Sequence, residues 1–277
     1  NSDKQEKIAF DLDGVFTAVW SPNGEKLAFV GNEGGASDIY LYEIKSKKTK
    51  NLTNDVFSDT EPSWSPNGEK IVFVSDRGIK SNSIKTTAKD MINHNYEQSD
   101  VFIIDLNSND IDQVTNTAYN ENYPIFSNTE NKLFYTADYQ GTWNLFRYDL
   151  DSRKSEPITN LLTGLFQLSL TKDDGSLVFS GYSGLGWDVF RLSNPLNLKT
   201  TKIEPTNYIA NREENDKEEL VDLRKDKRKG TFANTSDYSN YIFAWEFENY
   251  NKQDVSQEPL TVKPDSSFLN NEGDYVS

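Results

Sequence analysis

Two aspartates near the amino terminus have a spacing that phosphoryl-transfer chemistry can use. Asp11 and Asp13 follow the apolar run Ile8–Phe10. At the end of a buried strand, one such carboxylate can act as nucleophile and the second as acid or base, while both bind Mg²⁺. That chemistry also needs a following helix and further Ser or Thr, Lys and acidic residues in an α/β fold. The next segment, Trp20-Ser21-Pro22, begins a series of short strands instead, so the sequence predicts no phosphatase.

The chain lacks complete residue sets for nucleophilic or zinc chemistry. Gly181-Tyr182-Ser183-Gly184-Leu185 lacks the final glycine of a nucleophile elbow. A serine hydrolase also needs a base, and the only histidine, His94, lies in a polar segment where we expect it to be exposed to solvent. One histidine and no cysteine argue against a tetrahedral zinc site. The sequence therefore predicts no catalytic residue, no metal site and no cofactor.

An acidic segment in the middle of the chain partly matches a calcium-binding loop. Asp105–Asp110 has the initial acidic spacing, but Asp110 stands where such a loop needs glycine and Asn116 where it needs glutamate. Asp and Asn also favour tight turns. Because the segment falls between two predicted strands, we predict a hairpin turn there.

A repeat of 44 residues organises about two thirds of the chain. Trp20-Ser21-Pro22-Asn23-Gly24 returns as Trp64-Ser65-Pro66-Asn67-Gly68, with weaker copies at Phe126 and Leu170, and the intervals are 44, 62 and 44 residues. A period in the forties built of short strands is typical of a β-propeller, with one four-stranded blade per repeat. We predict an all-β fold with four recognisable four-stranded blades over residues 7–195.

Aspartates recur at one position of this repeat. Asp38, Asp100 and Asp188 each begin an Asp-aliphatic-aromatic segment. A shared structural role explains such a recurrence better than repeated ligands, so we predict that these carboxylates accept hydrogen bonds from neighbouring turns.

The interval of 62 residues exceeds the period of 44 by 18, and the additional residues lie between Arg77 and Asp100, within 78–99. Loops that project from a rigid scaffold commonly carry recognition residues. The insertion therefore supplies the candidate partner-binding residues, with a solvated loop of no function as the alternative. These candidates are Lys80, Lys85, Lys89, Met91, His94 and Tyr96.

The spacing of the repeat, extended toward the amino terminus, predicts that Ile8–Phe10 is the outer strand of a blade. The last repeat shows only three predicted strands, within residues 167–192. Two arrangements of the blades fit these observations. Residues 8–10 could complete the last blade and close a four-bladed ring, or they could belong to a larger propeller of about six blades. We favour the second, because four-bladed rings are rare. Asn1 in first position indicates a processed chain or a piece of a longer one.

The period ends after residue 195. Residues 196–230 are polar and of mixed charge, which predicts a charged linker, or a short surface helix around 217–225. Residues 231–277 form a predicted C-terminal extension with one strand at 241–247, where aromatic and aliphatic residues gather.

Composition limits the partners of the protein. The net charge of −15 argues against nucleic acid and anionic lipid, which both bind basic surfaces. The absence of cysteine from the sequence fits the cytoplasm or a periplasm. The sequence has no apolar run near the roughly 20 residues that span a bilayer, so we predict no membrane span.

The repeat resembles the TolB-type, WD40-like repeat of bacterial cell-envelope proteins. The likeness rests on Trp64-Ser65-Pro66-Asn67-Gly68, Asp38-Ile39-Tyr40 and Leu52-Thr53, and extends over residues 8–194, although the third and fourth copies depart from the Pro-Asn-Gly turn. It implies a periplasmic, outer-membrane-associated propeller without catalytic activity, acting as a scaffold that binds another protein. The alternative is the substrate-gating propeller of a prolyl-oligopeptidase-type serine peptidase whose hydrolase domain is not in this chain.

Overall fold

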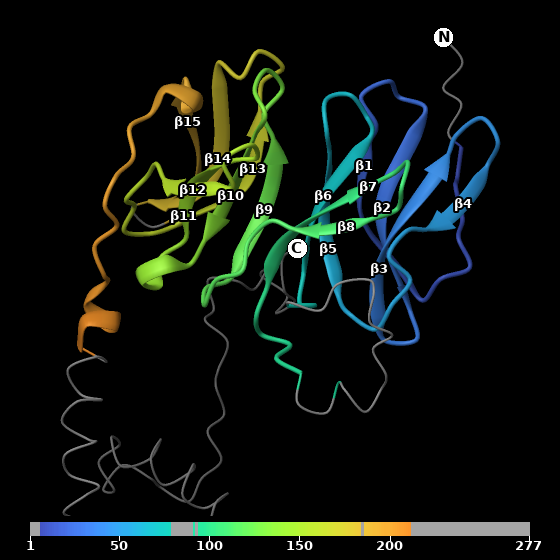
Figure 1. Ribbon diagram of the computed structural model, residues 1–277, viewed down its shortest axis with the longest axis horizontal. Helices are drawn as coiled ribbons and strands as arrows, with labels where there is room; N and C mark the ends of the chain where they lie inside the picture. The colour runs from blue at the N-terminus through green and yellow to red at the C-terminus, as the bar shows by residue number, and fades with distance from the viewer. Residues whose placement is uncertain (1–5, 79–90, 92–93, 184–185, 212–277) are drawn as a thin grey trace, which may run out of the picture. The chain divides into compact units, whose positions relative to one another are not determined.

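A computed structural model describes residues 6–78, 91, 94–183 and 186–211. These residues belong to one compact unit, residues 1–217. They form four antiparallel sheets, which are the blades of a propeller (Figure 1). The predicted all-β propeller is therefore confirmed. The predicted helix at 217–225 and strand at 241–247 lie outside the described residues.

The strands of each blade lie side by side in the order of the sequence. Blade 1 contains β1 (Gly14–Trp20), β2 (Lys26–Glu33), β3 (Ala36–Glu43) and β4 (Lys48–Asn51). Blade 2 contains β5 (Asp59–Trp64), β6 (Lys70–Ser75), β7 (Asp100–Asp105) and β8 (Ile111–Gln113). Blade 3 contains β9 (Glu121–Phe126), β10 (Lys132–Ala137), β11 (Asn144–Asp149) and β12 (Lys154–Pro157), with the 3-10 helix η1 (Tyr139–Gly141) between β10 and β11.

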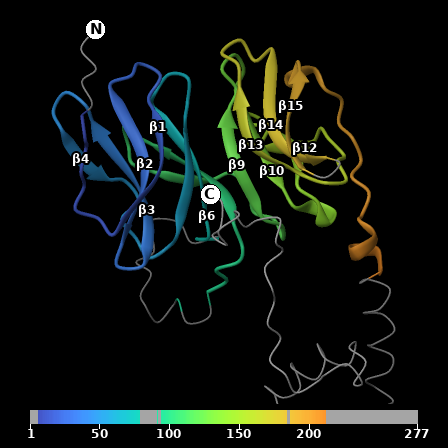
Figure 2. The ribbon, with the colours of Figure 1, turned by 180° about the vertical axis from the view of Figure 1, so that it is seen from behind.

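Blade 4 has three strands, as its repeat predicts. They are β13 (Leu165–Leu170), β14 (Ser176–Ser183) and β15 (Gly186–Ser193), followed by the 3-10 helix η2 (Pro195–Asn197). The chain then leaves blade 4 and runs to blade 3 (Figure 2), where Thr201 N–H donates to the Pro157 carbonyl at 2.9 Å.

The Ser-Pro-Asn-Gly segments form the tight turns that the sequence predicts. Gly24 N–H donates to the Ser21 carbonyl at 2.9 Å, and Gly24 has a φ of +70°, a conformation that costs glycine little. The Asn23 side-chain oxygen accepts from the Ser21 hydroxyl and the Glu25 N–H. The second copy repeats these contacts over residues 65–69.

The third turn has lost Pro-Asn-Gly and is held by a side chain of the next blade. The Asp174 carboxylate accepts from the Ser127 hydroxyl at 2.7 Å and from the N–H groups of Asn128 and Thr129, both at 2.9 Å. Burial raises the pKa of Asp174, but these hydrogen bonds outweigh that effect and leave the pKa below its ordinary value. The turn thereby also links blade 3 to blade 4.

The predicted role of the recurring aspartates is confirmed in the first two blades. Thr53 Oγ1 accepts the Ile39 N–H at 3.1 Å and donates to Asp38 at 2.9 Å. This contact fixes the chain that leads from blade 1 to blade 2. In blade 2, Asp100 accepts the N–H of Thr117 in the corresponding loop at 3.3 Å.

Residues 8–10 do not form the predicted outer strand. Ile8, Phe10 and Leu12 pack against the outer face of blade 1, and the Phe10 ring lies 4.4 Å from that of Phe29 and 5.5 Å from that of Tyr42. Covering an aromatic face removes more apolar surface from water than strand pairing at an edge does. The predicted strand is therefore wrong, and so is its pairing with the last blade. A larger propeller stays a prediction.

Successive blades bury the faces that they turn toward each other, and three apolar clusters form between the four sheets. The outward face of the last blade differs from these buried faces in its exposure to solvent. Ile39, Val101 and Leu145 occupy one position of the repeat and are all 0% exposed, whereas Val189, at the same position of blade 4, is 79% exposed. In the described part of the chain, the far side of blade 4 thus keeps apolar side chains in solvent.

A matched pair of tryptophans tests this arrangement. Trp64 is 9% exposed and its indole N–H donates to the Val19 carbonyl, whereas Trp20, one repeat earlier, is 60% exposed. We expect Trp64→Ala to lower the free energy of unfolding by about 3–5 kcal/mol, as for other buried aromatic residues. Trp20→Ala should change it by less than about 1 kcal/mol. Urea unfolding of both variants measures the difference, and equal losses would contradict the register of the blades.

Candidate functional site

Among the described residues, large exposed apolar side chains lie on β1, β14 and β15, after the last blade, and in the loops of one face. We call this the long-loop face; it consists of the loops that follow the second strand of each blade and those that lead from one blade to the next. The described end of the insertion, residues 94–99, and η1 both lie on it, at the lower side of Figure 1. Val56, Tyr96, Tyr119 and Leu162 are exposed in its loops. Among the described residues, none of the large exposed apolar side chains lies in the tight turns of the opposite face.

The described end of the insertion, residues 94–99, is anchored by a buried histidine. The His94 side chain is buried, and its Nε2 lies 3.3 Å from Oδ2 of Asp76. Its ring packs 5.4 Å from Phe57 and 4.7 Å from Tyr96. The expectation of a solvent-exposed His94 is therefore wrong, because a carboxylate and two aromatic rings hold the ring against blade 2.

The structure brings together three of the six candidate residues of the insertion. The Met91 carbonyl accepts the His94 N–H at 3.2 Å and the Tyr96 hydroxyl at 3.1 Å. The Tyr96 ring is exposed beside them. The other three candidates, Lys80, Lys85 and Lys89, lie outside the described residues.

The end of the insertion is bonded to the loop between blades 2 and 3. The Gln98 side chain donates to the Tyr119 carbonyl, and Ser99 N–H donates to the Asn120 side chain at 3.0 Å. The exposed rings of Tyr96 and Tyr119 consequently belong to two loops that are fixed to each other.

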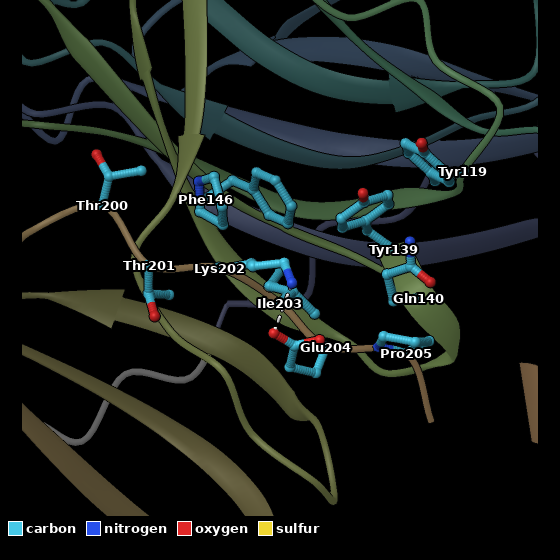
Figure 3. A pocket seen from close by; sticks show the side chains of 11 residues that line it. Tyr119, Tyr139, Gln140, Phe146, Thr200, Thr201, Lys202, Ile203, Glu204 and Pro205 are labelled. Atoms are coloured by element: carbon cyan, nitrogen blue, oxygen red, sulfur yellow. Dashed lines mark ion pairs between the residues drawn. The ribbon is translucent and has the colours of Figure 1, made fainter. Parts of the chain in front are cut away.

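A pocket of about 670 Å³ is lined in part by the Tyr119 side chain (Figure 3). The Tyr119 and Tyr139 rings meet edge to face at 4.7 Å, and Tyr139 lies 6.5 Å from Phe146. The segment after blade 4 forms the facing wall, with Ile203 buried and Lys202 paired with Glu204. The complete lining is Tyr119, Tyr139, Gln140, Phe146, Pro157 and residues 200–205.

This pocket suits recognition of a peptide. Aromatic rings and prolines offer flat apolar surface, which extended peptide segments commonly use, and Gln140, Lys202 and Glu204 add polar groups. The lining itself contains no histidine or cysteine. The sequence analysis missed the pocket, because its walls come from segments about 80 residues apart; exposed tyrosines in two predicted loops were the only signal.

A buried arginine organises the polar side chains at the junction of blades 1 and 2. The Arg77 guanidinium is buried, bonds Asp59 at 2.6 Å and Asp55 at 3.0 Å, and lies over the Phe73 ring. Burial raises the pKa of Asp55 to about 6, against the opposing effect of Arg77. With Asp38, these carboxylates are close enough together for a metal ion. Because Arg77 already binds two of them, we interpret the group as structural.

The equivalent carboxyl of blade 3 has no such arginine. Glu121 corresponds to Asp59, but Tyr139 stands where blade 2 has Arg77. Glu121 is buried beside Asp100 and accepts the hydroxyls of Thr115 and Thr117. Burial and then the neighbouring Asp100 raise the pKa of Glu121 to about 8. Glu121 is therefore largely protonated at neutral pH and can share its proton with Asp100.

The repeats, the sheets and the loop geometry define a β-propeller. The family model of the TolB β-propeller domain matches residues 2–93, so this part of the chain has repeats of the TolB type. No curated protein sequence matches the chain.

Solved structures share this fold at low sequence identity. TolB from Acinetobacter baumannii superposes with a TM-score of 0.51 and 17% identity, over 70% of this chain and 44% of that one. A protein described as TolB from Agrobacterium tumefaciens superposes with a TM-score of 0.52 and 19% identity, over 65% of this chain and 62% of that one. A puromycin hydrolase superposes with a TM-score of 0.50 and 12% identity, over 69% of this chain and 29% of that one. This chain thus spans less than two thirds of the length of each.

Glu121 predicts a pH dependence of stability. Its pKa is higher in the folded protein than in the unfolded chain, so the folded state holds the proton more tightly and loses stability as pH rises from about 5 to about 8. Glu121→Gln keeps an acceptor for the threonines and cannot ionise. We expect the variant to exceed the wild type in free energy of unfolding at pH 8 by roughly 2–4 kcal/mol, with little difference at pH 5. Urea unfolding across this pH range measures it.

Asp59→Asn is the control, because we expect it to lower the free energy of unfolding where Glu121→Gln raises it. It removes the partner of buried Arg77, and we expect a loss of about 3–5 kcal/mol at pH 7. If both variants lost stability alike at pH 8, the uncharged state of Glu121 would be contradicted.

Proposed function

We propose that this chain is a non-catalytic TolB-like propeller that binds a protein partner in the bacterial periplasm and acts there as a scaffold of the cell envelope. The observation that carries the proposal concerns the large exposed apolar side chains that lie in loops between the described strands. All of them, Val56, Tyr96, Tyr119 and Leu162, belong to the long-loop face. Side chains such as Tyr96 and Leu162 are costly to leave in water in one region of a soluble surface unless that region is covered by a partner.

The anchoring of the loops supports a binding role. In the described end of the insertion, residues 94–99, the His94 side chain is held against blade 2 and the Gln98 side chain is bonded to the loop of Tyr119. Loops held in this way lose little conformational freedom when a partner binds, and tyrosines are enriched at protein interfaces. Lys80, Lys85 and Lys89 belong to the same insertion, and we propose that they contribute charge to the interface.

The cell-envelope assignment rests on the likeness to TolB proteins. The absence of cysteine from the sequence is compatible with it. Within the described residues, no helix has the length and apolar character needed to cross a membrane.

A second candidate is the gating propeller of a serine peptidase. The observation in its favour is the shared fold with a puromycin hydrolase. The coding sequence on either side of this segment separates the two functions. A neighbouring α/β-hydrolase domain would favour gating, and a peptidoglycan-binding or outer-membrane segment would favour the scaffold.

Site-specific photo-crosslinking tests the proposed interface. A photoreactive phenylalanine analogue at Tyr96 or Tyr119 should give discrete adducts with periplasmic proteins, because both side chains are exposed on the long-loop face. The same analogue at Lys45, exposed in a turn of the opposite face, is the matched control. Adducts of equal yield at Lys45 would contradict the proposal.

The identified partner then allows a quantitative test. Tyr96→Ser and Tyr119→Ser should each weaken its binding at least tenfold, since exposed aromatic anchors dominate many interfaces. Lys45→Ser should leave affinity unchanged. Because Tyr96 also contacts the His94 ring and Tyr119 the Tyr139 ring, urea unfolding of the three variants is measured as well. Binding is then compared under conditions in which each variant is folded.

A further inference from the structure

Blade 4 ends on a strand whose outer edge is unpaired in the described part of the chain. β15 pairs with β14 alone, whereas the third strand of each earlier blade pairs with a fourth. Of the hydrogen bonds found outside the strand ladders, none reaches the main chain of Val189 or Arg191. An unpaired edge of this length is a template for another extended segment.

In blade 3, the equivalent edge of β11 is paired with the fourth strand, β12. On β11, Arg147 pairs with Glu156 of the fourth strand, and Pro157 follows opposite Phe146. Ile158 N–H then donates to the Leu145 carbonyl at 2.9 Å.

The end of that fourth strand is fixed by a threonine. Thr159 Oγ1 accepts the Leu145 N–H at 2.9 Å and donates to Asn144 at 3.0 Å. The strand is thus recognised by its sequence Glu-Pro-Ile-Thr as well as by its main chain.

The edge of β15 repeats the recognising residues at the spacing of 44. Arg191 corresponds to Arg147, Val189 to Leu145 and Asp188 to Asn144. Arg191 is exposed and donates only to the Ser176 hydroxyl, at 3.0 Å, among the contacts of the described residues. Neither of the first two blades has arginine at this position, where Leu41 and Ile103 stand.

We propose that the free edge of β15 docks one extended segment of a partner polypeptide with the sequence Glu-Pro-(Ile or Leu)-Thr. The glutamate pairs with Arg191, and the aliphatic residue packs beside the exposed Val189 and exchanges a main-chain hydrogen bond with it. The threonine hydroxyl lies between the Val189 N–H and the Asp188 carboxylate. Proline is tolerated because the added strand is the outermost one and needs no donor at that position. Main-chain pairing supplies affinity, and these three side-chain contacts supply selectivity.

This docking edge is distinct from the long-loop face, so the inference goes beyond the proposed function. It is tested with a synthetic peptide and needs no envelope partner. Either proposal can therefore fail while the other stands.

The test measures binding of a fluorescent peptide Lys-Ser-Glu-Pro-Ile-Thr-Asn, the sequence of residues 154–160, to the full chain. We expect saturable binding, with slower hydrogen exchange at the amides of Val189 and Arg191. Arg191→Glu should weaken binding at least tenfold, and a peptide with Lys in place of its Glu should regain that affinity on the variant. Lys172→Glu, an exposed charge reversal in the β13–β14 turn of the same blade, should bind like the wild type.

Two results would overturn the proposal. Absence of binding together with fast exchange at Val189 would show that the edge selects no such strand. The chain also carries the pattern at Glu258-Pro259-Leu260-Thr261, outside the described residues. Absence of binding together with slow exchange at Val189 that Glu258→Arg accelerates would replace the partner polypeptide with this segment of the chain.

Discussion

Each sheet of this protein has two apolar faces, and a neighbouring sheet is what buries them. Ile39, Val101 and Leu145 are buried because a further blade follows each of them, whereas the equivalent Val189 lacks such a neighbour in the described part of the chain. The chain partly compensates at the other end, where Phe10 and nearby apolar residues cover the outer face of blade 1. Stability in such a stack comes mainly from contacts between neighbours, so the inner blades gain most from it.

Within this repeated frame, a single exchange of residue type changes the chemistry of a blade. Arg77 neutralises Asp59 in blade 2, whereas Tyr139 occupies the corresponding place in blade 3. The exchange leaves Glu121 buried without a cation among its identified contacts, and this raises the pKa of its carboxyl. The same tyrosine builds a wall of the aromatic pocket. One position of the repeat thus determines both the surroundings of Glu121 and part of the wall of the pocket.

The two sides of the propeller carry different kinds of connection. The turns that follow first and third strands are short and polar, because they only reverse the chain within a blade. The loops of the other side vary in length and composition, and the exposed Tyr96 and Tyr119 lie there. The edge of β15 is a third kind of surface, since its main-chain groups as well as its side chains are unpaired on that side among the described residues.

The sequence by itself determined the period, the strands of each blade and the turns. These follow from local rules: a Pro-Asn-Gly segment fixes a turn, and short apolar runs between such turns indicate strands. It also located the insertion that carries Tyr96. The tertiary structure alone decided that residues 8–10 cover a face instead of forming a strand, that His94 is buried against Asp76, and that Tyr119 and Pro205 line one pocket. Each of these depends on contacts between segments distant in the chain, for which a periodic pattern contains no information.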